Sequence, residues 1–244
     1  MPNLDDIIWG TMASRDPEVL PEAFNGNNAY LDAIGNEDFL EMLRFHPQDL
    51  EVYEIRNILV KFLNKWGCRL RNYDNVTASN LKNCIVSIHP ELLSVQNHSI
   101  LDFDFEVTEN GEKIERIFNS FWFYGSQIAK NFGPTATSKT LHMINPALFT
   151  MWDEAIRLRY WVNNNQIIDS GRGYCIFQIE IKRIAEGLMM ECMERFHNDN
   201  AALMISDRLN INPPHSLTKF IDEFNWLAYK RGLRRPGNWV CPFG

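Results

Sequence analysis

The sequence predicts a mainly α-helical fold around one large core. From about residue 36 onward, apolar residues recur at the three- and four-residue spacing of a buried helix face. Of the 244 residues, 45% are apolar, and 16 Phe and 7 Trp supply enough bulk to fill such an interior. Capping residues and Gly or Pro breaks separate the periodic segments, which indicates several packed helices.

The first third of the chain contains an irregular start followed by two helical segments. Residues 1–33 are rich in Pro, Asn and Asp, so we predict that they lack regular structure. Asn36 is expected to cap a helix that runs to about His46. Residues 48–66 then place apolar side chains on one wide stripe, and Gly67 ends that helix in the usual way.

Residues 101–108 interrupt the helical pattern. Leu, Phe, Phe and Val alternate there with Asp, Asp, Glu and Thr, and a period of two is typical of a β-strand. One short strand is not stable alone, so we expect a small β-hairpin or an extended segment over the helices. Helices are predicted on both sides, from an N-cap at Thr77 to just before Pro90, and again from about Glu112.

The second half is predicted to be entirely helical. The expected helices cover residues 136–144, a segment beginning near Trp152, residues 173–196, residues 199–209, and a last helix capped by Ser216. The chain is long enough for one large domain or for two small lobes that share a cleft.

Composition excludes several classes of protein. No run of eighteen apolar residues occurs and the first residues carry no basic region, so we expect neither a membrane span nor a signal peptide, and a cytoplasmic location. The five cysteines form no C-x-x-C pair and the six histidines no H-x-x-x-H pair, so no metal or other cofactor is expected. A net charge of -7 argues against a general nucleic-acid-binding surface but permits a local basic one.

One segment, residues 132–159, combines features that carry chemistry. Small residues around Ala136 lead into a helix whose first turn bears Lys139, and Asp153 stands at the beginning of the next helix. Backbone N–H groups at a helix N-terminus can bind a phosphate, and the small side chains leave them accessible. Taken separately, Lys139 can also be a plain surface residue and Asp153 a plain N-cap.

This segment resembles the helix–hairpin–helix core of DNA glycosylases, in particular the 8-oxoguanine DNA glycosylase-like branch. In that family a hairpin holds a DNA phosphate through its backbone, a lysine follows, and an aspartate comes after the next helix. Lys139 and Asp153 stand at those two positions, and Arg157 matches a basic position behind the aspartate. Thr135 and Thr137 replace the glycines that usually flank the hairpin.

The resemblance implies an enzyme that extrudes a nucleotide from double-stranded DNA and excises a damaged or modified base. Asp153 would stabilise the oxocarbenium-like sugar while the base departs. Lys139, with a lowered pKa, would attack the same sugar carbon, form a Schiff base and nick the strand by β-elimination. Such a monomeric enzyme would act in base excision repair or in defence against modified foreign DNA.

The same resemblance assigns further residues and an architecture. The expected DNA-binding residues are Thr135, Ala136, Thr137, Arg157, Arg159, Arg234 and Arg235, and the expected base pocket consists of Trp152, His142 and Trp122. We expect residues 1–125 to form an N-terminal helical lobe. Residues 126–244 would form the lobe that contains the helix–hairpin–helix unit, with the cleft between the two.

A second interpretation belongs to another functional class. The chain is then a non-catalytic helical module that binds DNA or protein on a degenerate helix–hairpin–helix scaffold. The acidic net charge and the missing hairpin glycines support it. A positive surface around residues 135–159 favours the enzyme, and a neutral or acidic one favours the module.

Overall fold

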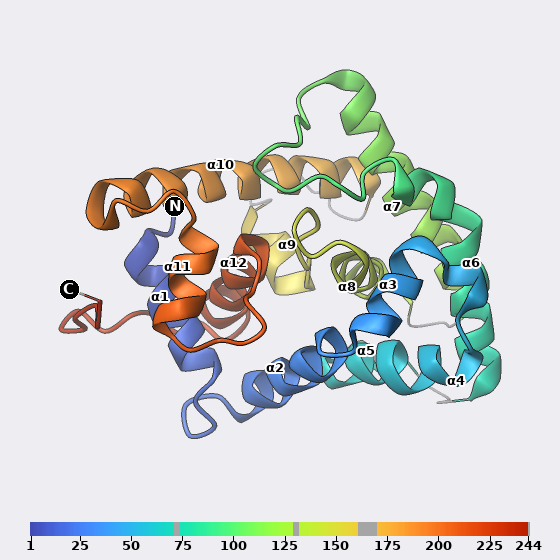
Figure 1. Cartoon of the computed structure of the whole chain (residues 1–244), viewed down its shortest axis with the longest axis horizontal. Helices are drawn as coiled ribbons and strands as arrows, with labels where there is room; N and C mark the ends of the chain where they lie inside the picture. The colour runs from blue at the N-terminus through green and yellow to red at the C-terminus, as the bar shows by residue number, and fades with distance from the viewer. Residues whose placement is uncertain (71–73, 129–131, 161–169, 244) are drawn as a thin grey trace.

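The computed structural model describes residues 1–70, 74–128, 132–160 and 170–243, and all the regular structure within these ranges is helical (Figure 1). The mainly α prediction is therefore confirmed. The helices are α1 (Leu4–Ser14), α2 (Pro21–Ile34), α3 (Glu37–Phe45), α4 (Val52–Glu54), α5 (Lys61–Lys65), α6 (Asn75–Leu93), α7 (Thr108–Ile128), α8 (Pro134–Ile144), α9 (Glu154–Tyr160), α10 (Gly171–Phe196), α11 (Ala201–Arg208) and α12 (Leu217–Asn225). Short 3₁₀ or π-helical pieces are η1 (Pro47–Asp49), η2 (Ile55–Val60) and η3 (Trp226–Lys230).

The helices are arranged around α8 and α9. In Figure 1, α10 runs along one long side of the molecule, α2 and α5 along the opposite side, and α8 and α9 are seen between them. α1 packs chiefly on α12, so the beginning of the chain lies against its last helix. The lobe boundary expected at residue 125 falls inside the continuous helix α7. No helix in the described part of the chain is long and apolar enough to cross a membrane.

The prediction of an irregular start is wrong, because residues 1–33 contain α1 and most of α2. Asn3 accepts a hydrogen bond from the backbone N–H of Asp6, and the Asp6 side chain accepts one from the backbone N–H of Asn3. This reciprocal cap satisfies N–H groups that the first turn leaves without partners. Pro21 opens α2 at the position where its missing N–H has no consequence. The polar residues and prolines that suggested a loop are helix starts.

The β-structure expected at residues 101–108 is also absent, and the chain there makes turns before α7 begins. Asp102 and Asp104 each accept a hydrogen bond at 3.0 Å from a nearby backbone N–H. Lys182 of α10 donates to the carbonyls of Leu101 at 2.8 Å and Phe103 at 3.0 Å. These contacts occupy backbone groups that a strand partner would need, so the alternating pattern reflects buried Phe side chains between turn-forming acids.

Several helix boundaries follow the predicted caps, and one does not. Asn36 and Ser216 accept hydrogen bonds from the first turns of α3 and α12, as expected. Asp74 caps α6 instead of Thr77, and the helix continues through Pro90. Proline removes one helical hydrogen bond near the end of α6 without ending the helix.

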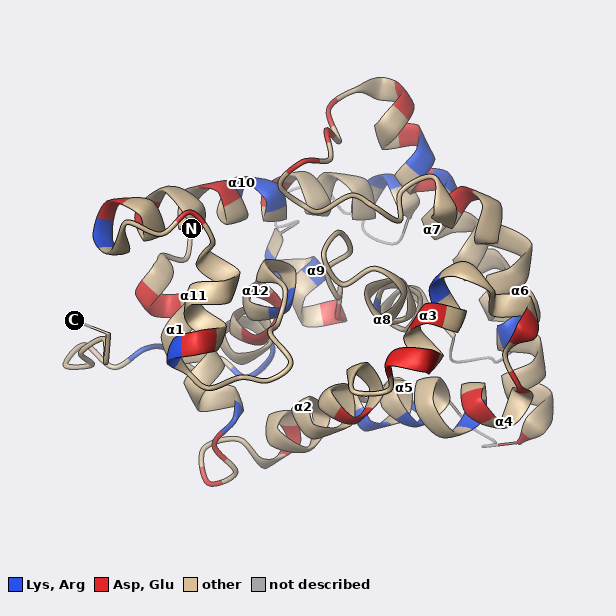
Figure 2. Ribbon diagram, viewed as in Figure 1, with Lys and Arg blue, Asp and Glu red and all other residues tan. Residues whose placement is uncertain are grey.

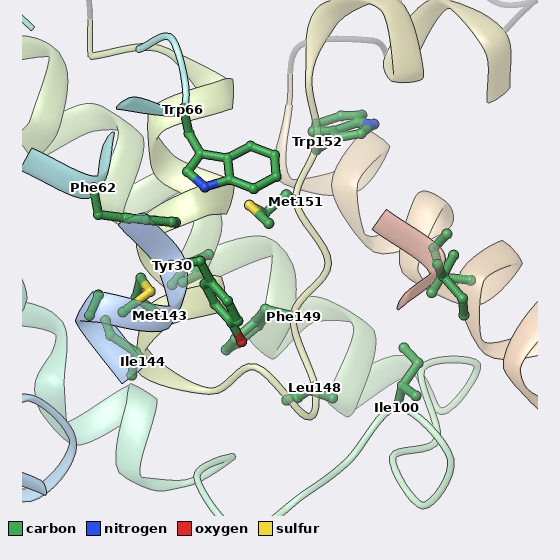
Figure 3. Packing of buried hydrophobic residues seen from close by; sticks show 14 of the residues in the cluster. Tyr30, Phe62, Trp66, Ile100, Met143, Ile144, Leu148, Phe149, Met151 and Trp152 are labelled. Atoms are coloured by element: carbon green, nitrogen blue, oxygen red, sulfur yellow. The ribbon is translucent and has the colours of Figure 1, made fainter. Parts of the chain in front are cut away.

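The core connects the two regions of the chain that carry the candidate site. Figure 3 shows Tyr30, Phe62 and Trp66 facing residues that come before α9, among them Met151. The Trp66 indole N–H donates to the carbonyl of Gly26 at 2.7 Å, which fixes the end of α5 against α2. Gly67 follows with a φ of +81°, a left-handed conformation that favours glycine, so the chain turns sharply after Trp66.

Candidate active site

The connection between α8 and α9 is held in one conformation by side chains. Asn145, just after α8, donates to the carbonyls of Val95, Gln96 and His98 at 3.0–3.1 Å. The hydroxyl of Ser138 on α8 accepts from the backbone N–H of Trp152 at 2.9 Å. These bonds hold the segment before α9 against α8 and place Asp153 beside Lys139.

Asp153 lies between two lysines. The Nζ of Lys139 is 2.7 Å from its Oδ1, and the Nζ of Lys230 is 2.7 Å from its Oδ2. Lys139 also donates to the backbone carbonyl of Trp66 at 2.6 Å. The side chains of Asp153 and Lys139 are 4% and 1% exposed, whereas that of Lys230 is 37% exposed. The expected proximity of Lys139 and Asp153 is therefore confirmed, and both groups are buried.

The electrostatics of this cluster fix its ionisation state. Burial raises the pKa of Asp153, but the charges of Lys139 and Lys230 outweigh it and hold the pKa below its usual range. Burial likewise lowers the pKa of Lys139, but the Asp153 carboxylate outweighs it and raises the pKa above its usual value. Asp153 is thus a carboxylate and Lys139 an ammonium. The lowered pKa expected for Lys139 as a nucleophile is a wrong prediction for this state of the protein.

Asp153 opens onto a cavity of about 400 Å³ at the N-terminus of α8. Its wall consists of residues 67–68, residues 133–136, residues 153–155, Arg157 and Lys230. Lys139 is not part of this wall, although its partner Asp153 is. The shared cleft predicted for the pair therefore contains the aspartate and Lys230, while Lys139 lies behind.

A second cavity, of about 620 Å³, adjoins the first because Ala155 lines both. Its wall includes Leu158, Tyr229, Arg159 and Arg234. Both arginines are exposed, so the two cavities together present basic groups around the beginning of α9. Figure 2 shows acidic residues spread over outer helices such as α1, α3 and α10. The net negative charge of the chain is thus distributed away from this face.

The predicted DNA-binding residues divide into three groups. Thr135 and Ala136 line the smaller cavity, and Arg159 and Arg234 the larger one, whereas Thr137 is fully buried. Arg157 is mostly buried and donates to the Thr135 hydroxyl and to the carbonyl of Trp152, both at 3.1 Å, so it holds α9 against α8. Arg235 forms ion pairs with Asp5 at 3.1 Å and Asp6 at 3.0 Å, which ties the C-terminal tail to α1.

The predicted base pocket is not assembled. Trp152 and His142 are fully buried in the core, and Trp122 is half-buried with its ring 6.5 Å from that of Phe118. None of the three lines either cavity around Asp153. His142 donates from Nδ1 to the carbonyl of Phe149 at 2.6 Å, and burial lowers its pKa to about 3, so the ring is neutral. These side chains belong to the core that supports the site.

Sequence reasoning did not assign Lys230 to the site, although Lys230 belongs to a basic cluster at residues 230–235. Cys68 is a second unassigned wall residue, and burial raises the pKa of its thiol to about 11, so the thiol is protonated. Within the described residues, no three His, Cys, Asp or Glu side chains come together in a way that would hold a metal ion.

No protein-family model, curated protein or solved structure matches the chain.

Proposed function

We propose that the protein is a DNA glycosylase that extrudes a damaged or modified base and cleaves its N-glycosidic bond with the help of Asp153. The observation that carries the proposal is a buried carboxylate, kept ionised by two lysines, in the wall of a cavity beside a helix N-terminus. Burying a carboxylate is unfavourable unless cations compensate for the lost hydration. A charge maintained in this way is suited to stabilising a cationic transition state.

The reaction follows from the position of that charge. When the bond between the base nitrogen and C1′ breaks, the electron pair leaves with the base, which takes up a proton, and positive charge develops on the sugar. A carboxylate with little access to water interacts with that charge more strongly than one in bulk solvent. Water then bonds to C1′ and loses a proton to solvent. Lys139 acts as a positioning residue that holds Asp153 by Oδ1 and anchors it to Trp66.

The charges around the two cavities favour a polyanionic substrate. Four basic side chains (Arg157, Arg159, Lys230 and Arg234) and two acidic ones (Asp153 and Glu154) line them, although the whole chain has a net charge of -7. The N-terminus of α8 adds backbone N–H groups that favour a phosphate. A DNA strand across this face would place one nucleotide at Asp153. Repair of damaged bases and defence against modified foreign DNA both require this chemistry.

A second candidate function is supported by one observation. Both carboxylate oxygens of Asp153 already contact a lysine, and the side chain is 4% exposed, as in a structural ion pair. In that case the protein is a non-catalytic module that binds DNA or another protein through the basic face. The two proposals differ in whether a duplex leaves the protein chemically changed.

The deciding experiment is a single-turnover assay of base release on duplexes that each contain one modified base, beginning with oxidised purines. We expect release from at least one duplex, and we expect Asp153→Asn to slow it by about 100–1000-fold while duplex binding persists. Glu154→Gln is the matched control, because Glu154 is an exposed acid of the same wall. Binding without base release from any duplex supports the module, and full activity of Asp153→Asn refutes the proposed role of the carboxylate.

A further inference from the structure

The two lysines that contact Asp153 differ in what they can reach. Lys139 is 1% exposed, its Nζ is bonded to the Trp66 carbonyl, and it does not line the cavity. Lys230 is 37% exposed, lies in the cavity wall, and approaches Asp153 from the end of η3. A molecule in the cavity therefore meets the Lys230 amine before it can meet the other.

We propose that Lys230, and not Lys139, is the amine that forms a Schiff base with an abasic deoxyribose, so that the protein also nicks DNA at abasic sites. This inference rests on the proposed function, since it places a second chemical step at the same carboxylate. The lysine of the helix–hairpin–helix segment, which the resemblance assigned to this step, then serves only to position Asp153.

The chemistry is balanced without a further reactant. The ammonium of Lys230 gives a proton to Asp153 across their 2.7 Å contact, and the free amine attacks the C1′ aldehyde of the ring-opened sugar. The N–C1′ bond forms and the aldehyde oxygen leaves as water, which gives an iminium. Loss of a C2′ proton to solvent then expels the 3′-phosphate, and water later hydrolyses the imine to restore the lysine.

The surroundings of Lys139 oppose the same step. Its Nζ would have to leave both the Trp66 carbonyl and Asp153, and it lies 5.5 Å from the centre of the Trp66 ring, which packs beside it. The Asp153 carboxylate also raises the pKa of Lys139, which keeps the amine protonated. Lys230 is followed by a chain reversal at Gly232, which has a φ of +68°, and its side chain already borders solvent.

The test uses a duplex with one preformed abasic site and sodium cyanoborohydride, which reduces an imine to a stable amine. The whole protein is trapped on this duplex, digested, and mapped by mass spectrometry. We expect the adduct on the peptide that contains Lys230. We also expect Lys230→Arg, which keeps the positive charge beside Asp153, to lower the trapped fraction by at least about 100-fold. Lys65→Arg, an exposed lysine of α5, is the matched control and should trap like the unmodified protein.

The outcomes separate this inference from the proposed function, because the abasic duplex requires no base release. An adduct on Lys139, undiminished trapping of Lys230→Arg, or no adduct at all would overturn the inference. If base release is observed in the single-turnover assay but no adduct forms, the glycosylase proposal stands and the Lys230 step fails. If an adduct forms on Lys230 but no modified base is released, the lysine assignment stands and the excision proposal fails. Mapping the unmodified protein keeps the test valid if Lys230→Arg folds poorly.

Discussion

Replacing Lys139 by methionine removes the cation from the most buried contact of the site while keeping an unbranched side chain that can fill the space. The protein loses a charge-assisted hydrogen bond to the Trp66 carbonyl, for which about 1.5–3 kcal/mol is typical. Breaking a buried ion pair by removing one partner costs about 3–5 kcal/mol. Because Lys230 still neutralises Asp153, we expect a total at the lower end, about 3 kcal/mol.

For a domain of this size, that loss corresponds to a decrease in melting temperature of roughly 6–12 °C. Urea denaturation followed by tryptophan fluorescence measures the free energy of unfolding directly. Lys65→Met is the matched control, because Lys65 is an exposed lysine of α5 and its replacement should change stability by less than about 0.5 kcal/mol. A Lys139→Met protein as stable as that control would refute the assignment of Lys139 as an anchored ammonium.

A double-mutant cycle isolates the contact between the two residues. Lys139→Met, Asp153→Asn and the double variant give a coupling energy, which we expect to be at least about 1 kcal/mol for groups 2.7 Å apart. Additive effects of the two substitutions would mean that the carboxylate depends on Lys230 alone.

Two further predictions concern pH and salt. Because burial lowers the pKa of His142 to about 3, its contribution to stability is complete above pH 6.5 and is lost as the pH falls towards 3. In His142→Asn, which keeps a donor for Phe149, the free energy of unfolding should depend on pH by about 1.4 kcal/mol per unit less in that window; equal slopes in denaturation series would contradict the buried neutral ring. Arg159→Ala combined with Arg234→Ala should lower the slope of log K against log[salt] for duplex binding by up to about two units, as measured by fluorescence anisotropy. Arg235→Ala, whose side chain is paired with Asp5 and Asp6, should leave that slope unchanged, and a reduced slope would show that Arg235 contacts DNA.

Local chemistry was sufficient to predict helices where a cap and a periodic stripe coincide, as at Asn36 and Ser216. The pattern in α1 was equally regular, since Leu4, Ile7 and Ile8 are all buried, but Asn and Asp occur in loops as often as in caps. The strand prediction was wrong because alternation reports only which side chains are buried. It does not say whether a partner strand exists, and Lys182 satisfies the carbonyls instead.

The site was predictable only as far as short-range geometry determines it. One helix and a tight connection separate Lys139 from Asp153, so their proximity followed from the sequence. The ionisation of the pair depends on Lys230, which is 77 residues away from Asp153, and no local pattern specifies that contact. Trp152 adjoins Asp153 in sequence, but consecutive residues of an extended segment point in different directions, and only the aspartate lines the cavity.

The packing of α1 on α12 determines when the molecule can be completed during its synthesis. Arg15, just after α1, pairs with Glu223 of α12 across 208 residues of sequence. At about 5–20 residues per second, the ribosome needs roughly 10–40 s to make the partner that covers α1. Throughout that interval the apolar face of α1 has left the exit tunnel without the surface it will finally contact. Lys230 is made last of the three charged groups, so the newly made chain acquires its candidate site only when translation is nearly finished.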